Sequence, residues 1–213
     1  MVLRALAART TQYQFRELFC CVVLGQTARF ELPSGSSNRF RALCKSLDLQ
    51  VVFSMQSFAL NYEVGGSTWS NTMSACDDSF PGGVRLAYVA KGQEIAQRLH
   101  DADDANDEHL TGILLGYPPC CVMEYLRWAT TSSRSPDPLD RLRHSKAALM
   151  LHKQYSPLDP FHRYEGLGWY SHVPCSLQCQ PTLEIAERRQ ATMAYYFPNL
   201  ARGSALMPFT TRT

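Results

Sequence analysis

Apolar positions follow two different periods along the chain. In residues 1–85 they form short runs rich in β-branched and aromatic residues, separated by Gly- and Ser-rich turns at 33–37 and 65–67. Such runs are typical of strands, because successive side chains of a strand point to opposite faces. They occupy residues 28–32, 51–55, 58–64 and 84–89.

Beyond Gly92 the apolar residues return at helical spacing instead. Proline and glycine residues mark the helix boundaries, as at Gly116 and Pro198. Helices are predicted at residues 93–105, 108–115, 120–128, 138–154 and 181–197, and a loop is predicted at 155–174. The pattern predicts an α+β fold in a single domain, 1–213, with a mixed subregion at 1–85 and a helix-rich region at 86–213.

Composition narrows the class of protein. A chain of 213 residues that is 45% hydrophobic can bury a core without the help of a metal. The net charge is +2 and the basic residues are scattered, so we expect no nucleic-acid partner. The acidic run at 101–108 has no calcium-loop spacing, and we interpret it as a solvated surface.

The N-terminal residues suggest no membrane association. Residues 1–16 carry several arginines and no acid before Glu17, and the apolar stretch that follows, 18–24, is far shorter than the about 20 residues of a membrane span. We therefore expect a basic first helix and a cytoplasmic protein without a membrane partner.

Eight cysteines in a chain of this length are too sparse for a disulfide framework. Two tandem pairs, Cys20-Cys21 and Cys120-Cys121, are poorly suited to disulfides, because a bridge between neighbours closes a strained ring. Thiols or thiolate ligands are the better interpretation.

Two segments carry the candidate chemistry. Each places a cysteine directly after proline, in Pro118-Pro119-Cys120-Cys121 and in Pro174-Cys175-Ser176-Leu177-Gln178-Cys179, and 53 residues lie between Cys121 and Cys175. The amides of a helix N-terminus stabilise thiolates and can donate hydrogen bonds to metal-bound sulfur. We predict that these four cysteines form one metal centre.

The kind of metal depends on geometry. Tandem side chains are expected to diverge and so to hold a single zinc ion badly, whereas a cubane cluster offers iron atoms at several corners. This favours an iron–sulfur cluster, [4Fe-4S], over zinc, with redox thiols as a further alternative. The other four cysteines, Cys20, Cys21, Cys44 and Cys76, are predicted to be core residues.

Several neighbours are candidates for roles beside the centre. His172 precedes Pro174-Cys175, and Glu124 shares a helical face with Cys120 and Cys121. We assign candidate acid–base roles to His172 and Glu124, with a Glu124–Arg127 surface pair as the alternative. Tyr117, Arg127 and Trp169 are the candidate walls of a substrate pocket.

Residues 112–126, Gly-Ile-Leu-Leu-Gly-Tyr-Pro-Pro-Cys-Cys-Val-Met-Glu-Tyr-Leu, and the later Pro174-Cys175-Ser176 through Cys179 carry a resemblance. They resemble the signature of an uncharacterised prokaryotic family that pairs tandem cysteines with a downstream Pro-Cys-Ser segment. Residues 120–124 are also similar to the tandem-cysteine motif of the four-iron cluster subunit of respiratory complex I. The first resemblance implies a four-cysteine site and no substrate. The second is a chemical precedent for adjacent cysteines that bind a four-iron cluster.

Two functions from different classes remain open. One is an iron–sulfur enzyme, an oxidoreductase or lyase, that acts on a small molecule or passes electrons to a partner. The other is a non-catalytic protein in which zinc or a cluster holds the two loops together and presents a surface to a partner.

Overall fold

The computed structural model describes residues 12–33, 35–60, 73–131 and 172–198. It confirms the α+β class. The chain divides into two compact units, residues 1–116 and 117–213. Strand β4 crosses the predicted subregion boundary at residue 85, and α4 and α5, which come after it, belong to the same unit as the sheet.

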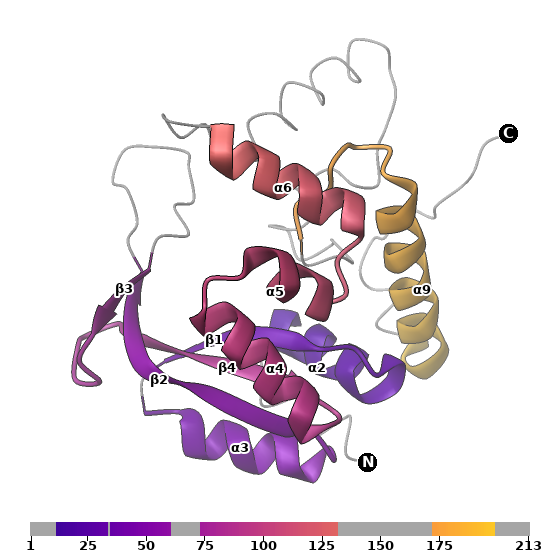
Figure 1. Ribbon diagram of the computed structural model, residues 1–213. Coiled ribbons are helices and arrows are strands. Elements are labelled where there is room, and N and C mark those ends of the chain that lie inside the picture. The colour runs from indigo at the N-terminus through magenta and orange to yellow at the C-terminus, as the bar shows by residue number, and fades with distance from the viewer. Residues whose placement is uncertain (1–11, 34, 61–72, 132–171, 199–213) are drawn as a thin grey trace, which may run out of the picture. The chain divides into compact units, whose positions relative to one another are not determined.

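The first unit is built on a four-stranded antiparallel sheet in the order β1-β4-β2-β3. The strands are β1 (Ala28–Pro33), β2 (Gln50–Leu60), β3 (Met73–Cys76) and β4 (Val84–Ala90), and the helices are α2 (Gln12–Leu24), α3 (Ser37–Ser46), α4 (Gln93–Asp104) and α5 (Glu108–Leu114) (Figure 1). The central strand β4 is buried along nearly its whole length, as expected for a strand covered on both faces.

Helices α3 and α4 cover opposite faces of this sheet. Phe30 of β1 packs against Phe40 of α3, with ring centroids 5.3 Å apart. The next residue back, Arg29, pairs instead with Asp103 of α4 at 2.7 Å. Neighbouring side chains of a strand point to opposite faces, so the two helices lie on different sides.

Asp103 departs from the solvated surface predicted for the acidic run. Its side chain is only 16% exposed, and its second carboxylate oxygen accepts a hydrogen bond from the Tyr88 hydroxyl at 2.6 Å. Asp107 is also engaged, because it accepts from the backbone N–H of Leu110 at 2.9 Å and so caps α5. Two carboxylates of this run are therefore structural.

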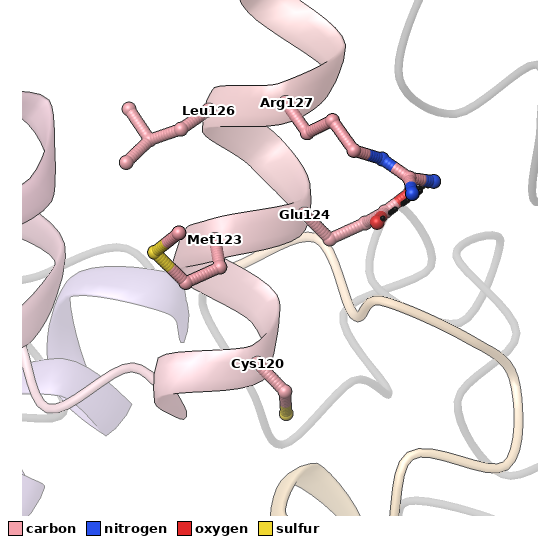
Figure 2. Close-up of a pocket in the computed structure, with 5 residues that line it drawn as sticks. All are labelled: Cys120, Met123, Glu124, Leu126 and Arg127. Atoms are coloured by element: carbon pink, nitrogen blue, oxygen red, sulfur yellow. Dashed lines mark hydrogen bonds and ion pairs between the residues drawn. The ribbon is translucent and has the colours of Figure 1, made fainter.

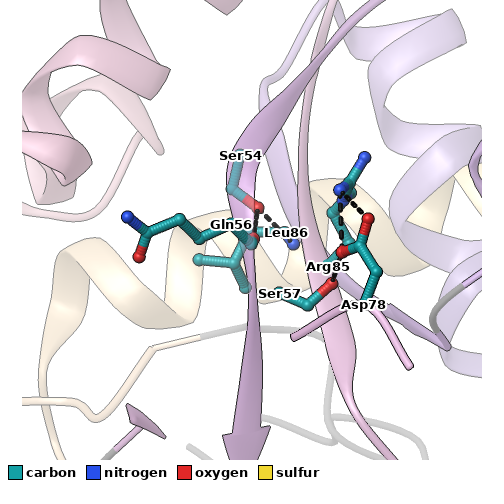
Figure 3. A network of polar contacts seen from close by, with 6 residues as sticks. All are labelled: Ser54, Gln56, Ser57, Asp78, Arg85 and Leu86. Atoms are coloured by element: carbon teal, nitrogen blue, oxygen red, sulfur yellow. Dashed lines mark hydrogen bonds and ion pairs between the residues drawn. The ribbon is translucent and has the colours of Figure 1, made fainter. Parts of the chain in front are cut away.

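Strand β2 merges two predicted strands into one. Its pairing with β4 shifts between Phe53 and Ser57, where β2 carries two more residues than its partner. Inside the irregularity the Ser54 side chain bonds backbone groups of both strands. Its hydroxyl accepts from the Leu86 N–H at 3.1 Å and donates to the Gln56 carbonyl at 2.7 Å (Figure 3).

Beside the irregularity, a polar cluster ties β2 to β4. The Ser57 hydroxyl donates to the carboxylate of Asp78. The Arg85 guanidinium donates to both oxygens of the same carboxylate, at 2.7 and 2.9 Å (Figure 3).

Predicted element positions agree well elsewhere. Strands β1 and β4 and helices α4 and α5 fall where the pattern placed them, whereas α3 and β3 were not predicted. Gly116 ends α5 with φ +75°, the left-handed conformation that glycine adopts without strain. None of the helices in the described ranges is long and apolar enough to cross a membrane.

The second unit contains α6 (Pro119–Thr131) and α9 (Gln180–Tyr196), close to the predicted helices at 120–128 and 181–197. Residues 172–179 precede α9 and consist of bends and a turn. The predicted helix at 138–154, and the predicted loop up to residue 171, lie outside the described residues.

Candidate metal centre

The first cysteine pair lies in the first turn of α6. Pro119 is the first residue of the helix, where its missing N–H removes no helical hydrogen bond. The Pro118 carbonyl accepts the N–H groups of Cys121 at 2.9 Å and of Val122 at 3.1 Å, which fixes this turn. Cys121 is buried and Cys120 is exposed.

The second pair comes from the segment before α9. Pro174 is fully buried and precedes Cys175, and a turn follows in which the Cys179 N–H donates to the Ser176 carbonyl at 3.2 Å. Cys179 is the N-cap residue of α9, and Pro181 stands in the first turn. Cys179 therefore lies at a helix start, whereas Cys175 lies in the segment that leads to it.

All four sulfurs meet at one point. The Sγ of Cys179 lies 3.5 Å from that of Cys121 and 3.8 Å from that of Cys120. The four Sγ atoms, including that of Cys175, lie within 4.8 Å of one another. The predicted convergence is confirmed, and these thiols are positioned to bind a metal.

The tandem pair does not diverge as expected. The sulfurs of Cys120 and Cys121 lie 4.0 Å apart, and both reach Cys179. The adjacent residues sit in the first turn of α6, where the side chains can turn toward the helix N-terminus and the segment in front of it. The geometric objection to a single metal ion is therefore wrong.

Hydrogen-bond donors surround the two buried sulfurs. The Thr182 hydroxyl donates to the Cys179 Sγ at 3.3 Å and lies 3.4 Å from the Cys121 Sγ. The Cys175 backbone N–H donates to the Cys121 Sγ at 3.3 Å. Such contacts stabilise metal-bound thiolates and fix their orientation.

His172 holds the Thr182 hydroxyl from the far side. Its Nε2 lies 2.9 Å from the Thr182 Oγ1, and its ring packs against Tyr117 with centroids 4.9 Å apart. Both His172 and Thr182 are buried, Thr182 completely. His172 therefore reaches the cluster through the Thr182 hydroxyl, which makes it a positioning residue in this geometry.

The titration of the thiols reflects this setting. Burial raises the pKa of the Cys175 thiol to about 11 and raises the pKa of Cys121 further still. Burial acts in the same direction on Cys179, but hydrogen bonding to Thr182 outweighs it and lowers the pKa of that thiol. Buried thiolates are costly unless a cation compensates them, so this site is better suited to a metal than to free nucleophiles.

We compared the chain with family models, curated proteins and solved structures. None of them matches it. The resemblance to the uncharacterised prokaryotic family therefore stays a prediction, and the function has to be argued from the site alone.

Glu124 and Arg127 line a shallow hollow on α6 with Cys120, Met123 and Leu126 (Figure 2). The Arg127 guanidinium pairs with the Glu124 carboxylate at 3.2 Å, which is the surface pair weighed against a catalytic role.

Tyr117 does not line this hollow but packs on the His172 ring. Trp169 lies outside the described residues.

In the part of the chain that the structure describes, the group of residues that could share a metal does not include the other four cysteines. Cys20, Cys21 and Cys44 are buried, as predicted, and Cys76 is half-buried. Thr182 is the site residue that the sequence analysis missed. Its position three residues after the N-cap Cys179 was the available signal, because N-cap side chains commonly contact that position.

Proposed function

We propose that Cys120, Cys121, Cys175 and Cys179 bind one metal ion that holds the N-termini of α6 and α9 together. Its role is structural, since it gives this unit a fixed surface for a partner. The observation that carries the proposal is the spacing of the four sulfurs.

This spacing agrees with a single tetrahedral ion. Metal–sulfur bonds of about 2.3 Å place the four sulfurs of a zinc site about 3.8 Å apart. The separations of 3.5, 3.8 and 4.0 Å among the sulfurs of Cys120, Cys121 and Cys179 lie close to that value, and all four sulfurs, including that of Cys175, lie within 4.8 Å of one another. Zinc also suits a closed set of four thiolates, because such sites are structural rather than catalytic.

The surroundings support the same ion. Four thiolates around a divalent metal carry a net charge of −2, which has to be stabilised where the site is buried. The Thr182 hydroxyl and the Cys175 N–H supply that stabilisation on the covered side.

An iron–sulfur enzyme is the second candidate, favoured by the exposed Cys120 beside the hollow that Glu124 and Arg127 line. A cubane with irons about 2.7 Å apart would hold its cysteine sulfurs about 6.4 Å apart. The cluster sulfurs would have to move outward by roughly 1.5 Å or more to accept it. His172 and Glu124 would then be the acid–base candidates, and a small molecule or an electron-transfer protein the partner.

Metal analysis of protein purified without oxygen tests the proposal. We expect one zinc per chain, a colourless solution and no acid-labile sulfide, and we expect Co²⁺ to replace zinc with the absorption bands of tetrahedral thiolate coordination. Cys121→Ser should lose the metal, whereas the matched control Cys44→Ser should keep it. Four irons and four sulfides per chain would replace this proposal with the second candidate, and a chain without metal would refute both.

A further inference from the structure

The four sulfurs are not shielded equally. Cys121 and Cys179 are buried, and both contact the Thr182 hydroxyl. Cys120 is exposed, and its sulfur makes hydrogen-bond contacts within the described ranges only with other sulfurs of the cluster.

This asymmetry decides which sulfur reacts. A metal-bound thiolate stays deprotonated and keeps nucleophilic character. A hydrogen bond to the sulfur withdraws electron density and reduces that character, and burial blocks the approach of a reagent. Cys120 lacks both kinds of protection.

We propose that Cys120 is the modification site of this centre: a peroxide oxidises its sulfur first, and a disulfide between Cys120 and Cys179 then releases the metal. The inference rests on the proposed metal site and adds its regulation by oxidants.

The chemistry balances with the peroxide as the oxidant. The Cys120 thiolate attacks one oxygen of hydrogen peroxide, the O–O bond breaks, hydroxide leaves, and the sulfur becomes a sulfenic acid, oxidised by two electrons. The Cys179 thiolate then attacks the Cys120 sulfur, an S–S bond forms, the S–O bond breaks and a second hydroxide leaves. The metal loses two of its four ligands.

Geometry favours Cys179 over Cys121 as the resolving partner. Its sulfur lies 3.8 Å from that of Cys120, whereas the neighbour Cys121 is at 4.0 Å and would close a strained ring.

The approach to Cys120 fits a small uncharged oxidant. The hollow beside it carries one carboxylate and one guanidinium, which pair with each other, so the remaining charge is that of the metal–thiolate centre, which is negative and repels anionic reagents. Met123 lines the same hollow and is 56% exposed, so its thioether competes for peroxide. An assay must therefore distinguish sulfenic acid from methionine sulfoxide.

The test uses the metal-loaded full chain and less than one equivalent of hydrogen peroxide, with dimedone to trap sulfenic acid. We expect the dimedone adduct on Cys120, located by fragment spectra because one tryptic peptide, residues 99–127, holds both Cys120 and Cys121. Without dimedone, we expect a Cys120–Cys179 disulfide joining that peptide to residues 164–188, with metal release at the same rate.

Variants separate this route from its alternatives. Met123→Leu should release metal at the wild-type rate, and so should Cys76→Ser, a half-buried cysteine outside the cluster. Cys120→Ser, where it retains metal, should release it at least about tenfold more slowly. The adduct position in the wild-type protein decides the matter if that variant does not bind metal.

The two failures are distinguishable. A chain that holds no metal before peroxide is added overturns the proposed function and this inference together. A metal-loaded chain whose adduct appears first on Cys175, or equally on all four cysteines, overturns the inference and leaves the metal site intact.

Discussion

Replacing Thr182 by valine should weaken metal binding without removing a ligand. The substitution deletes the hydroxyl that donates to the Cys179 Sγ at 3.3 Å and lies 3.4 Å from the Cys121 Sγ, and it removes the partner of the His172 Nε2 at 2.9 Å. A hydrogen bond to a charged group is worth about 1.5–3 kcal/mol. A loss of about 2 kcal/mol corresponds to a roughly 30-fold weaker metal affinity.

Competition with a chromophoric chelator measures this affinity directly. Thr182→Ser keeps the hydroxyl and should retain most of the affinity. Thr192→Val is the control for valine in α9, because the Thr192 hydroxyl bonds the Arg188 carbonyl one turn back and lies outside the cysteine cluster. Thermal unfolding of the metal-free proteins separates a loss of affinity from a loss of folding. Equal affinities for wild type and Thr182→Val, or equally weak binding by Thr182→Ser and Thr182→Val, would refute the reasoning.

Three further outcomes are expected in the first unit. Cys44→Ala should leave the metal content unchanged and cost about 1–3 kcal/mol of unfolding free energy, measured by urea titration, because it empties space in the core. Burial raises the pKa of Cys44 from 9.0 to about 12, so above pH 9 the folded state holds a proton that the unfolded chain releases. The free energy of unfolding should therefore fall by up to about 1.4 kcal/mol for each pH unit above 9. Urea midpoints between pH 8 and 11 should therefore fall less steeply in Cys44→Ala, and a parallel fall would contradict this assignment. Asp103→Asn should cost about 1–3 kcal/mol, because it weakens the ion pair with Arg29 and the bond from Tyr88, and an unchanged urea midpoint would show that this network contributes nothing.

Local pattern predicted the elements whose periodicity is unambiguous. The sequence shows the apolar runs of β1 and β4 and the helical spacing of α4 and α9. It also shows the end of α5 at Gly116 and the start of α6 at Pro119. Helix α3 was not predicted, although its buried residues Phe40 and Cys44 are one turn apart. The Gly- and Ser-rich turn before it is typical of a loop and hides the start of the helix. The irregularity in β2 was misinterpreted as a break between strands, since the compensation by Ser54 depends on the partner strand β4.

The sequence predicted which cysteines lie together but not the directions of their side chains. The proline-cysteine pairs in two segments were sufficient to predict that four thiols lie close together. Whether the side chains of Cys120 and Cys121 converge depends on their rotamers in the first turn of α6 and on the position of Cys179 in space. The spacing of cysteines along the sequence determines neither. The role of Thr182 was hidden for the same reason, because a threonine in the first turn of a helix is ordinary until its neighbours are known.

The two halves of the cysteine cluster lie far apart in sequence, and this has a consequence for the chain as a polymer. A link from Cys121 to Cys175 spans 53 intervening residues, and closing a loop of that size reduces the entropy of the unfolded chain by an equivalent of about 4 kcal/mol. The ion would act as a removable crosslink. A single peptide-bond cut between these two cysteines would then leave two fragments that the ion still links, and a chelator would remove that link.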